Sequence, residues 1–103
     1  SGGADTIFGG SGNDTILSGF GADLVFGDTG NDSLIGGDGG DTINGGDGAD
    51  RIEGVAGDDS QIGGAGNDSI DGGTGVADFA NGSSGFDLGK NNEIEINIEG
   101  VLP

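Results

Sequence analysis

Residues Gly36 to Asn44 read GGDGGDTIN, and residues Gly45 to Glu53 read GGDGADRIE. These adjacent nine-residue units share glycine at positions 1, 2 and 4, aspartate at position 6 and isoleucine at position 8. The pattern is G-G-x-G-x-D-x-U-x, where U is a large aliphatic residue. It predicts a repeat protein in which each unit forms a tight glycine loop followed by a short x-U-x strand.

Similar units extend on both sides of this stretch. Gly9–Leu17 and Gly63–Asp71 match the pattern completely, and the other units depart from it at one or two positions. The departures are an opening unit that lacks its first residue, Ser18 at position 1, Asp28 and Val55 at position 2, Gln61 at position 8 and Ala77 at position 6. We interpret residues 1–80 as nine nonapeptide units, and residues 81–103 as a degenerate unit followed by a closing strand.

The composition requires a cation. The chain has 28 Gly and 19 acidic residues in 103, and Arg51 and Lys90 are its two basic residues, so its formal charge is -17. A chain with so little apolar surface and so much charge stays disordered unless something removes the repulsion. The acidity argues against a nucleic-acid partner, which requires a basic surface.

The missing residue types narrow the chemistry further. Cysteine and histidine are absent, which excludes thiolate or imidazole metal sites and Cys- or His-based catalysis, and leaves oxygen ligands. No HExxH or GxSxG motif occurs, so we expect no enzyme activity. No run is long and apolar enough for a membrane span, and the start does not resemble a signal peptide. Because Ser1-Gly2-Gly3 opens in the middle of a unit, we expect the chain to be part of a longer protein.

The repeat resembles the hemolysin-type calcium-binding nonapeptide of RTX (repeats-in-toxin) proteins over residues 1 to 90. The resemblance implies a right-handed parallel β-roll with calcium bound between coils. It also implies type I secretion from a Gram-negative bacterium, with folding outside the cell or at its surface, where calcium is abundant. The expected function is a non-catalytic module that folds on extracellular Ca²⁺ and supports the secretion and folding of a larger protein.

Stacking arithmetic agrees with a roll. Two units, or eighteen residues, complete one coil, and successive coils stack at the spacing of about 4.8 Å of paired strands. Glycine at positions 1, 2 and 4 allows the positive φ angles of tight loops. The inward U side chains form two columns that are the whole predicted core: Ile7, Val25, Ile43, Gln61, Phe79, and Ile16, Leu34, Ile52, Ile70, Leu88.

The same arithmetic places the position-6 aspartates in two columns, Asp5, Asp23, Asp41, Asp59 and Asp14, Asp32, Asp50, Asp68. Unit charges about 4 Å apart repel by about 4 kcal/mol at an effective dielectric near 20, so a column without cations is unfavourable. Ca²⁺ accepts six to eight oxygens in flexible geometry, and two stacked loops can supply carboxylates and glycine carbonyls, whereas Mg²⁺ demands a stricter octahedron. About six Ca²⁺ ions, one between each successive pair, would bring the formal charge from -17 to about -5.

The predicted backbone ligands are the glycines at positions 1 and 4: Gly9, Gly12, Gly27, Gly30, Gly36, Gly39, Gly45, Gly48, Gly54, Gly57, Gly63 and Gly66. Asp87 is a possible further ligand. Because Ala77 replaces an aspartate and Asp78 is out of register, we expect the first column to end at Asp59. The aspartates outside position 6 are interpreted as solvated charges: Asp28, Asp38, Asp47, Asp58 and Asp71.

Two features fall outside the regular repeat. Gln61 predicts a weak point in the core, with Ile62 compensating by a local shift. Residues 92–99, NEIEINIE, alternate at period two and predict a half-buried strand that covers the open end of the stack.

The outward position after U is apolar in four N-terminal units, at Phe8, Leu17, Phe26 and Ile35. We expect these faces to contact an upstream domain or another protein. They support an alternative function, a calcium-rigidified adhesion or surface-layer assembly module. An ice-binding surface is disfavoured, because the loop positions carry no regular rank of Thr and Asn.

Overall fold

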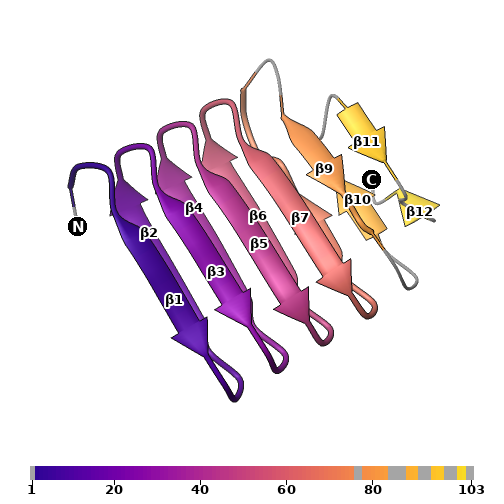
Figure 1. Cartoon of the computed structure of the whole chain (residues 1–103). Helices are drawn as coiled ribbons and strands as arrows, with labels where there is room; N and C mark the ends of the chain where they lie inside the picture. The colour runs from indigo at the N-terminus through magenta and orange to yellow at the C-terminus, as the bar shows by residue number, and fades with distance from the viewer. Residues whose placement is uncertain (1, 76–77, 84–87, 91–93, 97–99, 102–103) are drawn as a thin grey trace.

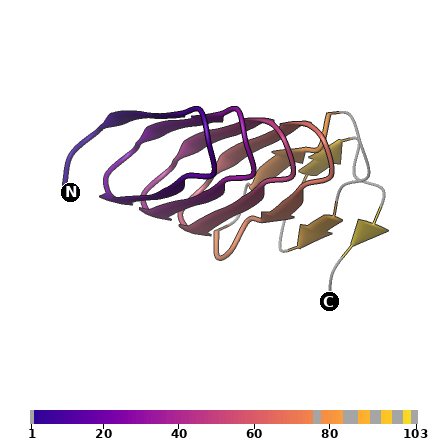
Figure 2. The same cartoon turned by 90° about the horizontal axis from the view of Figure 1, so that it is seen from below.

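The computed structural model describes residues 2–75, 78–83, 88–90, 94–96 and 100–101. In these ranges the chain forms parallel strands without a helix, and it winds as a flattened coil in which two six-stranded sheets face each other (Figures 1 and 2). The predicted parallel β-roll is confirmed.

Odd-numbered strands form one sheet and even-numbered strands the other. The β1 sheet contains, in order, β1 (Thr6–Gly10), β3 (Leu24–Asp28), β5 (Thr42–Asp47), β7 (Ser60–Ala65), β9 (Phe79–Asn81) and β11 (Ile94–Ile96). The β2 sheet contains β2 (Thr15–Phe20), β4 (Ser33–Asp38), β6 (Arg51–Ala56), β8 (Ser69–Asp71), β10 (Leu88–Lys90) and β12 (Gly100–Val101).

The core lies between the sheets and consists of U side chains. Val25 pairs with Ile43 in the β1 sheet, and Leu34 pairs with Ile52 in the β2 sheet, each one eighteen-residue coil apart. The buried apolar side chains are Ile16, Val25, Leu34, Ile43, Ile52, Ile70 and Ala80, with Ile7 packed against them. Strict alternation along each strand places one residue in this core and its neighbours outside.

The register departs from the prediction at β9. Ser60 pairs with Phe79 and Gln61 with Ala80, so the step there is nineteen residues, and Ala80 takes the inward position predicted for Phe79. In the β2 sheet, Ser69 pairs with Leu88 and Ile70 with Gly89, so Leu88 is likewise not at the predicted register position.

The predicted C-terminal strand exists over Ile94–Ile96, but it does not lie across the end of the stack. It pairs in parallel with β9 and extends the β1 sheet as its last strand (Figure 1). The remainder of the predicted segment, 92–93 and 97–99, lies outside the described residues.

Glycine has two different roles in each unit. Positions 2 and 4 adopt positive φ, as at Gly46 (92°) and Gly48 (117°), which confirms the predicted tight loops. The glycines at position 1 are not among the positive-φ residues. The prediction of positive φ was therefore wrong for position 1. Glycine is needed there because a side chain would collide with a neighbouring carboxylate.

Candidate functional site

The position-6 aspartates lie where each loop enters a strand. Their backbone carbonyls accept hydrogen bonds from the next coil; the N–H of Thr42, for example, donates to the Asp23 carbonyl at 2.8 Å. Six of the eight predicted aspartates are buried, namely Asp23, Asp32, Asp41, Asp50, Asp59 and Asp68, and Asp5 and Asp14 are half-buried. Burial of this many carboxylates demands partners of opposite charge or many hydrogen bonds.

In each pair of successive coils, one oxygen of the later carboxylate accepts a hydrogen bond from the earlier coil. The backbone N–H of Asp23 donates to Asp41 Oδ1 at 2.9 Å, and that of Asp32 donates to Asp50 Oδ1 at 2.8 Å. The same bond joins Asp5 to Asp23, Asp41 to Asp59, Asp14 to Asp32 and Asp50 to Asp68. The structure thus assembles the eight predicted aspartates into the two predicted columns. We call the contact between the loops of two successive coils at one edge a junction, and name it by its two aspartates.

The second carboxylate oxygen is buried and accepts no hydrogen bond from any described residue. This holds for Oδ2 of Asp14, Asp23, Asp32, Asp41, Asp50 and Asp59. An unsatisfied buried acceptor costs about 1–3 kcal/mol, and more when it is charged. A row of such atoms is typical of a site that a cation completes.

The space beside these oxygens is defined by position 1. A Cβ at Gly27 would lie 2.5 Å from Asp32 Oδ2 and 2.6 Å from the carbonyl oxygen of Gly45. A Cβ at Gly45 would lie 2.5 Å from Asp50 Oδ2 and 2.6 Å from the carbonyl oxygen of Gly63. The missing side chain therefore leaves room where a carboxylate oxygen and a carbonyl oxygen converge.

This donor set fits calcium. Within the described ranges no three acidic side chains gather at one point, and the oxygens that converge beside position 1 are a carboxylate and a backbone carbonyl. Ca²⁺ accepts such mixed oxygen sets. The predicted position-1 glycines lie in the strands and do not have positive φ. The position-4 glycines lie in the turns and have positive φ, as at Gly30 and Gly66.

The electrostatics of the columns are unfavourable without a cation. Burial raises the pKa of Asp59 to about 6, the N–H of Asp41 opposes this shift, and the charges of Asp41, Asp78 and Asp58 add to it. Burial also raises the pKa of Asp41 and Asp50, again opposed by a backbone N–H and reinforced by the aspartate one coil earlier. Repulsion along each column is therefore visible in the folded chain.

Asp78 is a residue of this site that the sequence prediction missed. It is fully buried, and its Oδ1 accepts the N–H of Asp59 at 2.9 Å. The expectation that the first column ends at Asp59 was wrong, because one additional residue before Asp78 restores the alignment. The sequence did contain a signal: Asp78-Phe79-Ala80 reads D-x-U if alanine is accepted as the core residue. Asp87 lies outside the described residues.

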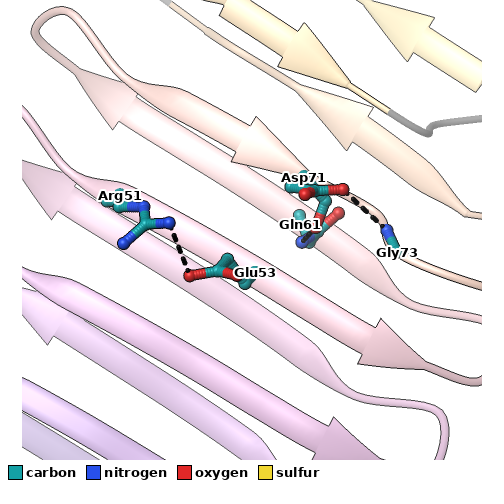
Figure 3. A network of polar contacts seen from close by, with 5 residues as sticks. All are labelled: Arg51, Glu53, Gln61, Asp71 and Gly73. Carbon is teal, nitrogen blue, oxygen red and sulfur yellow. Dashed lines mark hydrogen bonds and ion pairs between the residues drawn. The ribbon is translucent and has the colours of Figure 1, made fainter. Parts of the chain in front are cut away.

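The other acidic residues lie apart from the columns. Asp28, Asp38, Asp47 and Asp58 are exposed, as predicted. Asp71 is half-buried, and its Oδ1 accepts the N–H of Gly73 at 2.9 Å (Figure 3). Figure 3 also shows the ion pair between Arg51 and Glu53, 3.1 Å, on the outer face of β6.

Gln61 is fully buried in the core. Its Nε2 donates to the carbonyl of Asp71 at 2.8 Å, and its Oε1 accepts no hydrogen bond from the described residues (Figure 3). Gln61 keeps the register with Ile43, and Ile62 pairs with Asn44, so the predicted compensating shift by Ile62 does not occur.

The N-terminal outer faces are apolar on both sheets. Phe8 and Leu17 are 65% and 68% exposed, and the rings of Phe8 and Phe26 stack with centroids 5.0 Å apart. Phe26 and Ile35 are half-buried. Phe20, the last residue of β2, is also exposed.

Comparison with protein families gives a match to the RTX calcium-binding nonapeptide repeat, four copies, over residues 1–34, 26–61 and 45–77. Comparison with curated proteins and with solved structures gives no match. In the described part of the chain, no helix has the length and apolar character needed to cross a membrane.

Proposed function

The chain belongs to the RTX calcium-binding nonapeptide repeat family, and we propose that it is a non-catalytic module that completes its folding when it binds Ca²⁺ outside the cell. In this role it supports the folding and secretion of a larger secreted bacterial protein. RTX repeats are typical of secreted bacterial proteins, which supports this location.

One observation carries the proposal. In the two columns, six aspartates present a buried Oδ2 with no hydrogen-bond donor among the described residues: Asp14, Asp23, Asp32, Asp41, Asp50 and Asp59. A Cβ at Gly9, Gly27, Gly45 or Gly54 would meet both such an oxygen and a carbonyl of the following coil. Divalent cations at these points would supply the missing partners and reduce the repulsion along the column. Because the unfolded chain cannot preserve such sites, the binding free energy contributes to folding, and stability rises with ion concentration.

The proposed ligands are the carboxylates that form the seven observed junctions. These are 5/23, 23/41, 41/59 and 59/78 on one edge, and 14/32, 32/50 and 50/68 on the other. The carbonyls of the position-1 and position-4 glycines complete the proposed oxygen set.

The test is a calcium titration of the chelated chain followed by far-UV circular dichroism, with magnesium as the control cation. We expect a cooperative gain of β-sheet signal at about 10⁻⁴ to 10⁻³ M Ca²⁺, the range of extracellular modules, and no comparable gain with Mg²⁺. A chain that is fully folded in chelator, or that responds equally to Mg²⁺, contradicts calcium-coupled folding.

A second candidate function is calcium-rigidified adhesion or surface-layer assembly through the apolar N-terminal faces. The exposure of Phe8 and Leu17 favours it, and so does the stacking of Phe8 on Phe26. Contiguous apolar side chains on a surface mark interaction sites, whereas single exposed ones are common. Sedimentation velocity in calcium should then show concentration-dependent association that the double variant Phe8→Ser, Leu17→Ser loses. Thr42→Ser is a control in the exposed surface of β5. A monomer at all concentrations contradicts self-assembly.

A further inference from the structure

Ser18 breaks the rule that position 1 has no side chain. It lies on β2 in the inward column that continues through Gly36 and Gly54. Ser18 is 1% exposed, and its Oγ donates to the carbonyl oxygen of Gly36 at 2.5 Å. Its backbone is not in the positive-φ region, so the serine adopts the position without strain.

Ser18 has a side chain at the position where the units with glycine leave space. By the repeat, Ser18 relates to Asp23 and Gly36 as Gly27 relates to Asp32 and Gly45. At Gly27 the position of a Cβ is 2.5 Å from the carboxylate oxygen and 2.6 Å from the carbonyl oxygen. These values are close to Ca²⁺–oxygen distances of about 2.3–2.6 Å, so a side chain there competes with a cation for the same oxygens.

The partner of Ser18 makes the competition specific. The Gly36 carbonyl accepts the Ser18 hydroxyl. Its equivalent at junction 32/50, where position 1 is glycine, is the Gly45 carbonyl, which lies beside the same space as the unsatisfied Asp32 Oδ2. At junction 23/41 the Gly36 carbonyl already accepts a hydroxyl hydrogen. The hydroxyl is neutral, so it joins the two coils through this carbonyl without an ion. Asp23 Oδ2 is buried there without a donor among the described residues, as at the other junctions, so what Ser18 removes from the oxygen set is the Gly36 carbonyl.

We propose that Ser18 closes junction 23/41 with a hydrogen bond in place of calcium, so that this junction is independent of calcium and the module binds one ion fewer than its aspartate pairs allow. The inference rests on the proposed function, because it concerns which of the proposed sites are used. It makes Ser18 a residue that sets the number of ions bound, and it places a calcium-independent contact near the N-terminal end of the roll.

Native mass spectrometry of the calcium-loaded chain tests this by counting ions in the wild type, Ser18→Gly and Ser18→Ala. We expect Ser18→Gly to bind one ion more than the wild type, because it opens the space beside Asp23. Ser18→Ala keeps the Cβ and should bind the same number as the wild type. The reciprocal variant Gly27→Ser should bind one ion fewer, and it tests the proposal even if Ser18→Gly does not fold.

The possible failures are distinguishable. Equal ion counts in the wild type, Ser18→Gly and Gly27→Ser overturn the inference and leave the proposed function intact. A loss of one ion in Ser18→Ala shows that the hydroxyl is a ligand, which also overturns it. No bound calcium in any variant removes the proposed function, and the inference with it.

Discussion

The backbone N–H of Asp59 donates to Asp78 Oδ1 at 2.9 Å across nineteen residues, whereas the equivalent bond from Asp41 to Asp59 spans eighteen. The chain therefore has one additional residue between Thr74, which pairs with Ala56, and Phe79, which pairs with Ser60, and the same carboxylate hydrogen bond recurs. The ladder continues on the far side of the step, where the N–H of Phe79 donates to the carbonyl of Asp59 at 2.8 Å.

This relationship predicts that Asp78 holds an ion. Asp78→Asn should reduce the ion count of the calcium-loaded chain by one, because it removes a charged ligand from junction 59/78. Native mass spectrometry provides the count. Asp47→Asn is the matched control: it removes the same charge from the exposed end of β5 and should leave the count unchanged. If both variants bind as many ions as the wild type, Asp78 is a buried structural carboxylate only.

The space beside position 1 predicts the effect of a single methyl group. Gly45→Ala should lose one ion and about 1–3 kcal/mol of stability in calcium, because its Cβ would contact Asp50 Oδ2 and the carbonyl of Gly63. Gly2→Ala is the control, since Gly2 has open space around it and is not a positive-φ residue. Denaturant unfolding in excess calcium measures the difference. Equal stability of the two variants contradicts the role assigned to position 1.

Val55 is a position-2 residue with a φ of 85°, a conformation that a β-branched side chain rarely adopts. Val55→Gly should stabilise the calcium-loaded roll by about 1 kcal/mol, because strain of about 1–3 kcal/mol is removed and part of the gain is offset by the flexibility of glycine. Thr42→Gly, at an exposed position of β5 without positive φ, should instead destabilise it. Thermal unfolding in calcium compares the two. A lower stability of Val55→Gly would show that the strain is absent or compensated.

The buried carboxylates predict how the calcium-free chain responds to pH. The pKa of Asp59 in the folded chain, which burial raises to about 6, lies above its ordinary value of 3.8. Between these values the folded chain binds more protons than the unfolded chain, so stability increases as pH falls through about 6 and is lost as pH rises through it.

In chelator, the β-sheet signal should accordingly be larger at about pH 4.5 than at about pH 7.5, and Asp59→Asn should weaken this dependence. Circular dichroism against pH gives the profile. A signal that falls on acidification would show that the buried carboxylates are not the groups that oppose folding.

Much of this roll follows from the spacing of a few residue types. Val25, Ile43, Leu34 and Ile52 recur at an eighteen-residue interval, and this interval predicts both sheets, the core and the two aspartate columns. The step at β9 escaped prediction because the interval was assumed to continue, which put Ala77 at the aspartate position and Phe79 in the core.

Other features required atomic positions. The sequence shows glycine at positions 1 and 2 alike, but the structure separates them: Gly46 needs its positive φ, and Gly45 needs the space beside Asp50. In the sequence Ser18 is a small residue in place of glycine. Its hydrogen bond to the Gly36 carbonyl can be seen only in the structure.

Each buried aspartate faces two junctions at once. Asp41 receives the N–H of Asp23 on Oδ1, and its Oδ2 lies beside position 1 of its own loop, Gly36. Neighbouring junctions on one edge thus share a carboxylate, while the described junctions of the two edges have no carboxylate in common. The proposed sites therefore form two separate rows, and within each row binding at one junction is expected to affect its nearest neighbours through the shared carboxylate before it affects the opposite edge.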